Sequence, residues 1–143
     1  MTSWLLLHYK LPNKPSALRV YTWRKLKRLG AILLHEAVWV LPDQPRTAEQ
    51  VQWLTAEIQE MGGDVFYWKA NTALGEADGS LMEQFKGQVD AIYSDLLKRL
   101  QRPRADVEEI SRQYQHAVAQ DFFHSKLGVQ VREKLTSKRG EKS

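Results

Sequence analysis

The sequence contains no cysteine, and this absence excludes several kinds of chemistry. None of the 143 residues offers a thiol for nucleophilic catalysis, for an iron–sulfur cluster or for a cysteine zinc site. Disulfides are excluded too, as is usual in a reducing compartment. A chain of this length buries about two thirds of its unfolded surface without cross-links. We therefore expect a compact cytoplasmic protein.

Long apolar runs are also absent. No run approaches the roughly 20 residues that a membrane helix needs. The first residues, 1–7, lack the basic start and the long apolar stretch of a signal peptide. We therefore expect no contact with membranes.

Acidic residues are missing from the first quarter of the chain. Residues 1–35 hold seven basic side chains and no Asp or Glu, whereas residues 36–125 hold eight basic and fifteen acidic ones. Residues 126–143 are basic again. The net charge of +4 therefore hides a basic, acidic, basic pattern, which suits an anionic partner for the first segment.

Hydrophobic periodicity predicts alternating strands and helices in the first half. Ser16 is placed to cap the first helix and Gly30 to end it, while Thr47 and Gln50 form a capping box for the second. The predicted order is a strand at 3–11, a helix at 16–29, two strands within 31–42 joined by a turn at 35–37, a helix at 47–61 and a strand at 64–70. This order predicts an α+β, ferredoxin-like split βαβ fold, with one four-stranded antiparallel sheet and both helices on one face.

The second half changes to a purely helical pattern. Apolar residues recur at helical spacing over 81–100 and 107–118, and a last helical stretch is expected at 124–136. The short break at Pro103 favours an antiparallel helix pair. We therefore expect a core at 1–72, a helical extension packed on it at 73–136, and a disordered basic tail at 137–143.

The five tryptophans have two interpretations. Trp4, Trp39 and Trp68 fall in predicted strands, which favours core packing with a second apolar layer over the sheet. The alternative is that they stack nucleic-acid bases, as sheet aromatics do in some RNA-binding domains. Core packing is preferred because the interleaved glycines and basic residues of such domains are missing.

The first helix separates apolar from basic residues. Its predicted apolar arc holds Leu18, Thr22, Trp23, Leu26 and Leu29, while Arg24, Lys25, Lys27 and Arg28 are placed on the opposite arc. Arg19 falls within the apolar arc without explanation. The four cations are suited to phosphate contacts, or they form a solvated surface stripe.

The usual signatures of catalysis and metal binding are missing. None of the four histidines lies three or four residues from another. No serine nucleophile elbow, glycine-rich phosphate loop or close carboxylate pair at a strand end is found. We therefore predict no catalytic residue, no metal, no cofactor and no enzymatic activity.

Several segments resemble the N-terminal domain of the chromate-resistance regulator family ChrB. They are Trp4 to Leu7, Trp23 to Ala31, Val38 to Pro42 with Arg46 and Thr47, Gln52 to Leu54 with Glu57 and Ile58, and Gln120 to Phe123, which is similar to an Asp-Phe-Phe signature of the family. The resemblance covers residues 3 to about 135 and implies a role in regulating a chromate-efflux operon. Full-length members continue into a second domain, so the resemblance implies an N-terminal module.

A weaker likeness is to the middle domain of the repressor PaaX and to ferredoxin-like CRISPR nucleases. Those nucleases carry a metal-binding acid at the end of the first strand, where this sequence has His8, Tyr9 and Lys10. This substitution argues against a nuclease.

The leading hypothesis is a non-enzymatic regulatory domain that contacts the backbone of duplex DNA. Its candidate residues are Arg24, Lys25, Lys27 and Arg28, flanked by Lys10, Lys14 and Arg19. Open sheet edges further predict a homodimer. A protein-interaction or dimerisation module with an acidic partner, and a residual nuclease, are the alternatives. Nothing in the sequence distinguishes a pocket for chromate from a basic patch.

Overall fold

The computed structural model describes residues 3–71 and 75–142. The chain divides into two compact units, residues 1–79 and 80–143. The elements in chain order are β1 (Ser3–Lys10), α1 (Ser16–Leu29), β2 (Ile32–Leu34), β3 (Val38–Pro42), α2 (Pro45–Glu60), β4 (Asp64–Asn71), α3 (Gly75–Leu100), α4 (Val107–Val118) and α5 (Lys126–Lys142).

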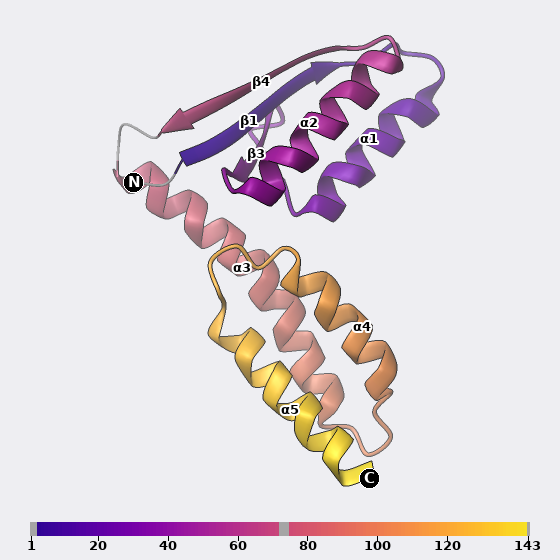
Figure 1. Cartoon of the computed structure of the whole chain (residues 1–143), viewed down its shortest axis with the longest axis vertical. Coiled ribbons are helices and arrows are strands. Elements are labelled where there is room, and N and C mark those ends of the chain that lie inside the picture. The colour runs from indigo at the N-terminus through magenta and orange to yellow at the C-terminus, as the bar shows by residue number, and fades with distance from the viewer. Residues whose placement is uncertain (1–2, 72–74, 143) are drawn as a thin grey trace. The chain divides into compact units, whose positions relative to one another are not determined.

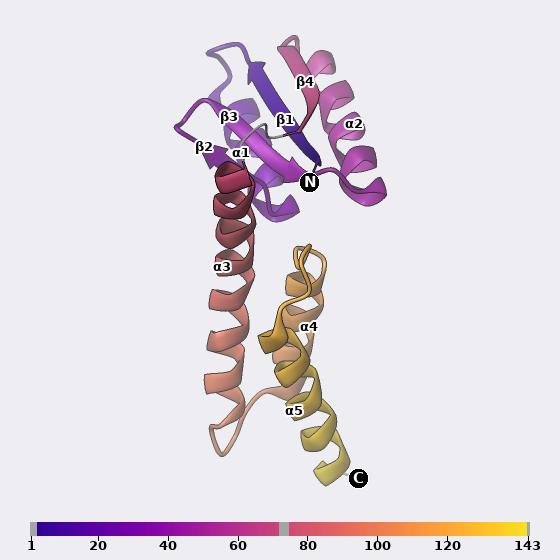
Figure 2. The same ribbon diagram turned by 90° about the vertical axis from the view of Figure 1, so that its left-hand side faces the viewer.

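The first unit is built on one antiparallel sheet of four strands in the order β2-β3-β1-β4. Leu6 in the central strand β1 pairs with Val40 of β3 on one side and with Trp68 of β4 on the other. Both α1 and α2 lie on the same face of the sheet (Figures 1 and 2). This topology confirms the predicted ferredoxin-like split βαβ fold.

Alternation along the strands places the core between the sheet and the two helices. Leu5 and Leu7 of β1 point to the helix face and are buried, as are Leu26 of α1 and Leu54 and Ile58 of α2. Gly63 lies where the chain passes from α2 into β4, and an added Cβ there would meet the Lys10 carbonyl oxygen at 2.8 Å. Any residue with a side chain would therefore clash with the β1 backbone at this turn.

The helix starts differ from the predicted caps. Pro15 takes the cap position of α1 in an extended conformation, and Ser16 is the first helical residue without a side-chain cap. In α2 the cap is Gln44, whose N–H donates to the Thr47 hydroxyl at 2.9 Å. Pro45 fits the first helical position because it has no N–H to leave unsatisfied. Gly30 ends α1 in the left-handed conformation, as predicted.

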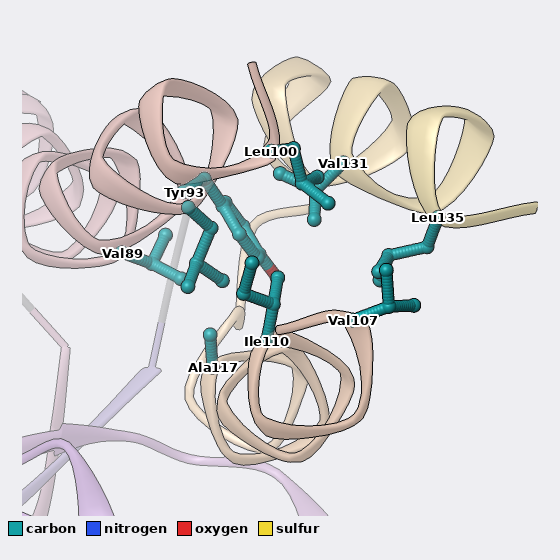
Figure 3. Packing of buried hydrophobic residues seen from close by; sticks show 9 residues of the cluster. Val89, Tyr93, Leu100, Val107, Ile110, Ala117, Val131 and Leu135 are labelled. Atoms are coloured by element: carbon teal, nitrogen blue, oxygen red, sulfur yellow. The ribbon is translucent and has the colours of Figure 1, made fainter. Parts of the chain in front are cut away.

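The second unit packs three helices around one apolar cluster (Figure 3). Tyr93 of α3, Ile110 of α4 and Val131 of α5 meet in this cluster and are fully or almost fully buried. The helix α4 runs back along α3, as predicted, and Arg99 of α3 donates to the Gln113 side-chain oxygen of α4 at 2.7 Å.

Both ends of the helical part extend beyond the predicted bounds. The helix α3 begins at Gly75, in a polar stretch where apolar periodicity gives no signal. The helix α5 continues to Lys142, so the expectation of a disordered tail is wrong for the described residues. Arg139 in that tail donates to the Ser111 hydroxyl of α4 at 2.8 Å, which anchors the last turns. The prediction that the extension packs on the core stays a prediction.

The tryptophans are divided between core and surface. Trp4 and Trp39 are buried, as predicted. The prediction is wrong for Trp68, which is 57% exposed, because β4 is an edge strand and this side chain lies on the face opposite α1 and α2. Its ring lies 6.3 Å from that of Phe66, which is exposed too.

Candidate functional site

Six of the seven candidate DNA contacts are exposed, and Lys25 is the exception. Its Nζ lies 3.0 Å from Glu57 Oε1 of α2, and Tyr21 donates to the other oxygen of Glu57 at 2.5 Å. The assignment of Lys25 to the exposed arc is therefore wrong. The reason is helical geometry, because Lys25 lies seven residues, or about two turns, after Leu18 and shares its inner face.

The ion pair shifts the pKa values of both partners. The hydrogen bond to Glu57 raises the pKa of Lys25 above its ordinary value. The hydrogen bond from Tyr21, followed by the charge and hydrogen bond of Lys25, lowers the pKa of Glu57. Lys25 therefore stabilises the contact between α1 and α2 rather than standing open to a partner.

The exposed side of α1 carries a mixed aromatic and basic stripe. Arg19, Trp23 and Lys27 follow one another at intervals of four residues and so line one side of the helix. The Lys27 ammonium lies 5.5 Å from the Trp23 ring centroid and 5.9 Å from that of Trp39 in β3, within cation–π range. Trp23 is 48% exposed, so its assignment to the apolar arc is wrong. Arg19 lies four residues before Trp23 and therefore shares the exposed side of α1 with it, which explains why a charged residue stands at this position.

A pocket of about 710 Å³ opens beside this stripe, between α1, the end of β1 and the β2–β3 turn. We call it the α1 pocket. Three of the predicted cations, Lys10, Arg19 and Arg24, line it together with a single acid, Glu36. Its other lining residues are Tyr9, Leu11, Asn13, Ser16, Val20, Trp23, Leu33, Ala37 and Trp39. The structure therefore gathers three of the candidate cations at one hollow, while Lys14 and Arg28 are exposed but do not line it.

Two aromatic side chains that line the α1 pocket, Tyr9 and Trp39, are joined by a hydrogen bond. The indole N–H of Trp39 donates to the Tyr9 hydroxyl, and Arg19 lies near enough to act on the same hydroxyl. Burial outweighs both of these influences and raises the pKa of Tyr9.

The β2–β3 turn at the rim of the α1 pocket is strained. His35 and Glu36 have φ angles of 49° and 58°, in the left-handed region that non-glycine residues rarely adopt. Two such residues in succession correspond to a tight hairpin turn, which favours Asn and Gly. Their place beside the pocket fits the tendency of backbone strain to be stored near functional sites.

Comparison with known proteins shows which family this chain belongs to. The model of the family described as "Protein ChrB, N-terminal" matches residues 19–122, which is more than half of the chain. The chain belongs to this family. Residues of the α1 stripe, the α1–α2 ion pair and most of the α1 pocket fall within the matched range.

A curated relative is also similar to this chain. The chain is 26% identical over 108 residues to Protein ChrB of Cupriavidus metallidurans, and the match covers 76% of this chain but 33% of that protein. The chain therefore spans about a third of the length of this relative. No solved structure matches the chain.

The Asp-Phe-Phe segment of this ChrB N-terminal domain has a structural role. Asp121 accepts a hydrogen bond from the Tyr93 hydroxyl at 3.0 Å and another from the Ser125 N–H at 2.9 Å. The Phe122 and Phe123 rings lie 5.7 and 6.3 Å from the Phe85 ring. The segment thus ties the α4–α5 connection to α3.

Over 3–71 and 75–142, no three His, Asp or Glu residues are grouped closely enough to hold a metal ion. None of the described helices is long and apolar enough to cross a bilayer.

Sequence reasoning missed the aromatic half of the α1 pocket. It identified Arg24 as part of a basic arc on the first helix and Lys10 and Arg19 as flanking cations, but not Tyr9, Trp39 and Glu36 as their neighbours. The interval of four residues from Arg19 to Trp23 to Lys27 was the one available signal. It places an indole between two cations on the same side of a helix.

Proposed function

We propose that this chain is the N-terminal module of a ChrB-type chromate-resistance regulator, without enzymatic activity, and that it contacts the backbone of duplex DNA. Six exposed cations of the first unit form the proposed contact, which we call the basic surface: Lys10, Lys14, Arg19, Arg24, Lys27 and Arg28. Lys25 is left out because it is paired with Glu57.

The observation that carries the proposal is the convergence of Lys10, Arg19 and Arg24 at one side of α1. No salt bridge among the described residues engages any of these three. Exposed Arg and Lys side chains bind phosphates through charge-assisted hydrogen bonds and release counterions from DNA. Membership of the ChrB N-terminal family supports the regulatory context.

The test is the salt dependence of binding to duplex DNA. The variant Arg19→Gln, Arg24→Gln, Lys27→Gln, Arg28→Gln should bind every duplex more weakly. Its plot of log affinity against log salt should be flatter by roughly 0.9 per lost phosphate contact. The matched control removes the same charge from exposed residues of the second unit, by Arg102→Gln, Arg104→Gln, Lys126→Gln and Lys134→Gln. The control should keep the native slope.

An equal loss in both variants would mean that net charge, and not the basic surface, determines binding. If the native chain binds no duplex even at low salt, the proposal fails. An acidic protein partner for α1 then takes its place.

We further propose that the chain forms a homodimer through β4. This strand is at the edge of the sheet and exposes Phe66, Tyr67 and Trp68. Antiparallel pairing of β4 with a second copy about a two-fold axis at Tyr67 would set Phe66 opposite the partner's Trp68. Such cross-strand aromatic pairs stabilise a sheet, and the pairing would leave no open β4 edge. A dimer also supplies two basic surfaces in fixed relation, as symmetric DNA half-sites require.

A further inference from the structure

We propose that the α1 pocket binds a nucleotide, with the phosphate on its cations and the base on its aromatic rings. The site does not depend on DNA binding, although it shares three cations with the basic surface. Its ligand is defined by two features that occur together, an anionic phosphate and a planar ring.

The charge of the lining selects an anion. Lys10, Arg19 and Arg24 face a single carboxylate, that of Glu36, so the pocket carries an excess of positive charge. Two arginines offer planar guanidinium groups that bind phosphate oxygens in pairs. Asn13 and Ser16 add uncharged polar groups to the same lining.

The rings of the lining select a planar group. Tyr9, Trp23 and Trp39 all line the pocket, and half of the Trp23 surface is open. Trp39 is buried, so Trp23 is the ring on which a base can stack, and stacking tolerates any base because each has a flat face. The Lys27 ammonium lies 5.5 Å from the Trp23 centroid and 5.9 Å from that of Trp39, which adds a positive charge beside these rings.

The size of the pocket separates a nucleotide from a small inorganic anion. Pockets for small organic ligands have volumes of roughly 300 to 1,000 Å³, and the α1 pocket has about 710 Å³. A tetrahedral oxyanion alone would leave most of this volume empty, and it has no flat face that could stack on an aromatic ring. A base joined through a ribose to a phosphate would place the phosphate at the arginines and the base at the open face of Trp23.

Calorimetric titration of the native chain without DNA tests the proposal. The probes are the four ribonucleoside 5′-monophosphates, with inorganic phosphate and adenosine as the two halves of the ligand. At least one monophosphate should bind about tenfold more tightly than either half, because the charged and stacking contacts act together.

Two pairs of variants locate the site. Trp23→Leu should weaken nucleotide binding about fivefold or more, whereas Trp53→Leu, on an exposed indole of α2 outside the pocket, should not. Arg19→Gln with Arg24→Gln should weaken it about tenfold, and Arg102→Gln with Arg104→Gln should leave it unchanged. Circular dichroism establishes that each variant is folded, and the arginine pair still tests the site if the Trp23 variant is not.

Further titrations distinguish a free nucleotide from the end of a DNA strand as the ligand. They also separate nucleotide binding from the proposed binding of duplex DNA. A 5′-phosphorylated oligothymidylate that displaces the monophosphate would identify the end of a DNA strand as the source, and one that does not would identify a free nucleotide. Trp23→Leu should leave the salt slope of duplex binding unchanged, so the loss of one activity does not imply loss of the other. If no monophosphate binds more tightly than inorganic phosphate at up to about 5 mM, the α1 pocket is a plain anion patch and the proposal is wrong.

Discussion

At the scale of single residues, the two units are stabilised by carboxylates that accept more than one hydrogen bond. Glu57 accepts from Tyr21 and Lys25 in the first unit, and Asp121 accepts from Tyr93 and from the Ser125 N–H in the second. Hydrogen bonds to charged acceptors are stronger than neutral ones. Removal of a single donor should therefore have a measurable effect on stability.

Tyr93→Phe should lower the free energy of unfolding by about 1.5 to 3 kcal/mol, because a hydrogen bond to a charged group is lost inside the apolar cluster. Urea denaturation measures the change. Tyr114→Phe is the control, since it keeps the ring that lies 6.0 Å from the Tyr93 ring. The control should change stability by less than about 0.5 kcal/mol, and equal losses would contradict the role given to Asp121.

The Glu57 contact should make stability depend on pH in the acid range. The pKa of Glu57 is lowered in the folded state, so its contribution is complete above the ordinary value of 4.5 and is lost as pH falls through the folded value. Glu57→Gln should therefore flatten the decline in stability below about pH 4.5, as followed by thermal unfolding. Glu49→Gln is the control on the same helix. A native-like decline in the Glu57 variant would rule the contact out as its cause.

At the scale of secondary-structure elements, the β2–β3 hairpin shows a local sequence that opposes its own turn. A turn with two residues at positive φ favours Asn-Gly, whereas this chain has His35 and Glu36. The flanking strands override this preference because Leu33 and Trp39 are paired in the sheet. The hairpin was predictable from its apolar runs, but the strain was not.

The double variant His35→Asn, Glu36→Gly should raise the free energy of unfolding by about 1 kcal/mol or more, because each residue then suits its backbone conformation. The measurement is urea denaturation. Glu36→Gln is the control, as it removes the same charge from the rim of the α1 pocket but keeps the strained turn. A gain in the control equal to that of the double variant would attribute the effect to charge.

At the scale of the whole molecule, the exposed β4 edge and the basic surface are the two features on which the proposed dimer and the proposed DNA contact depend. The first unit exposes three adjacent aromatic residues on β4, and soluble proteins rarely leave such an edge open. The basic surface lies on α1, the end of β1 and the loop between them, and β1 is the neighbour of β4 in the sheet, where Lys10 pairs with Asp64.

Sedimentation at tens of micromolar, a range in which weak dimers form, should give a dimer for the native chain. Trp68→Lys should give a monomer, because it sets a charge in the proposed β4 contact. Trp53→Lys is the control, since this indole of α2 is even more exposed, at 66%. A native monomer, or a dimer that survives the Trp68 substitution, would contradict the β4 interface.

The order of the elements, the ferredoxin-like sheet and the family were predictable from the sequence, because periodicity, turn residues and motif order are local properties of the chain. The sequence also identified the cations of the first segment. It could not tell which of them are open to a ligand, since the partner of Lys25 lies 32 residues away on another helix. Helix packing settled that pairing, and strand order exposed Trp68 at a sheet edge. The α1 pocket exists only where β1, α1 and the β2–β3 turn meet, so its combination of cations and rings is a product of the tertiary structure.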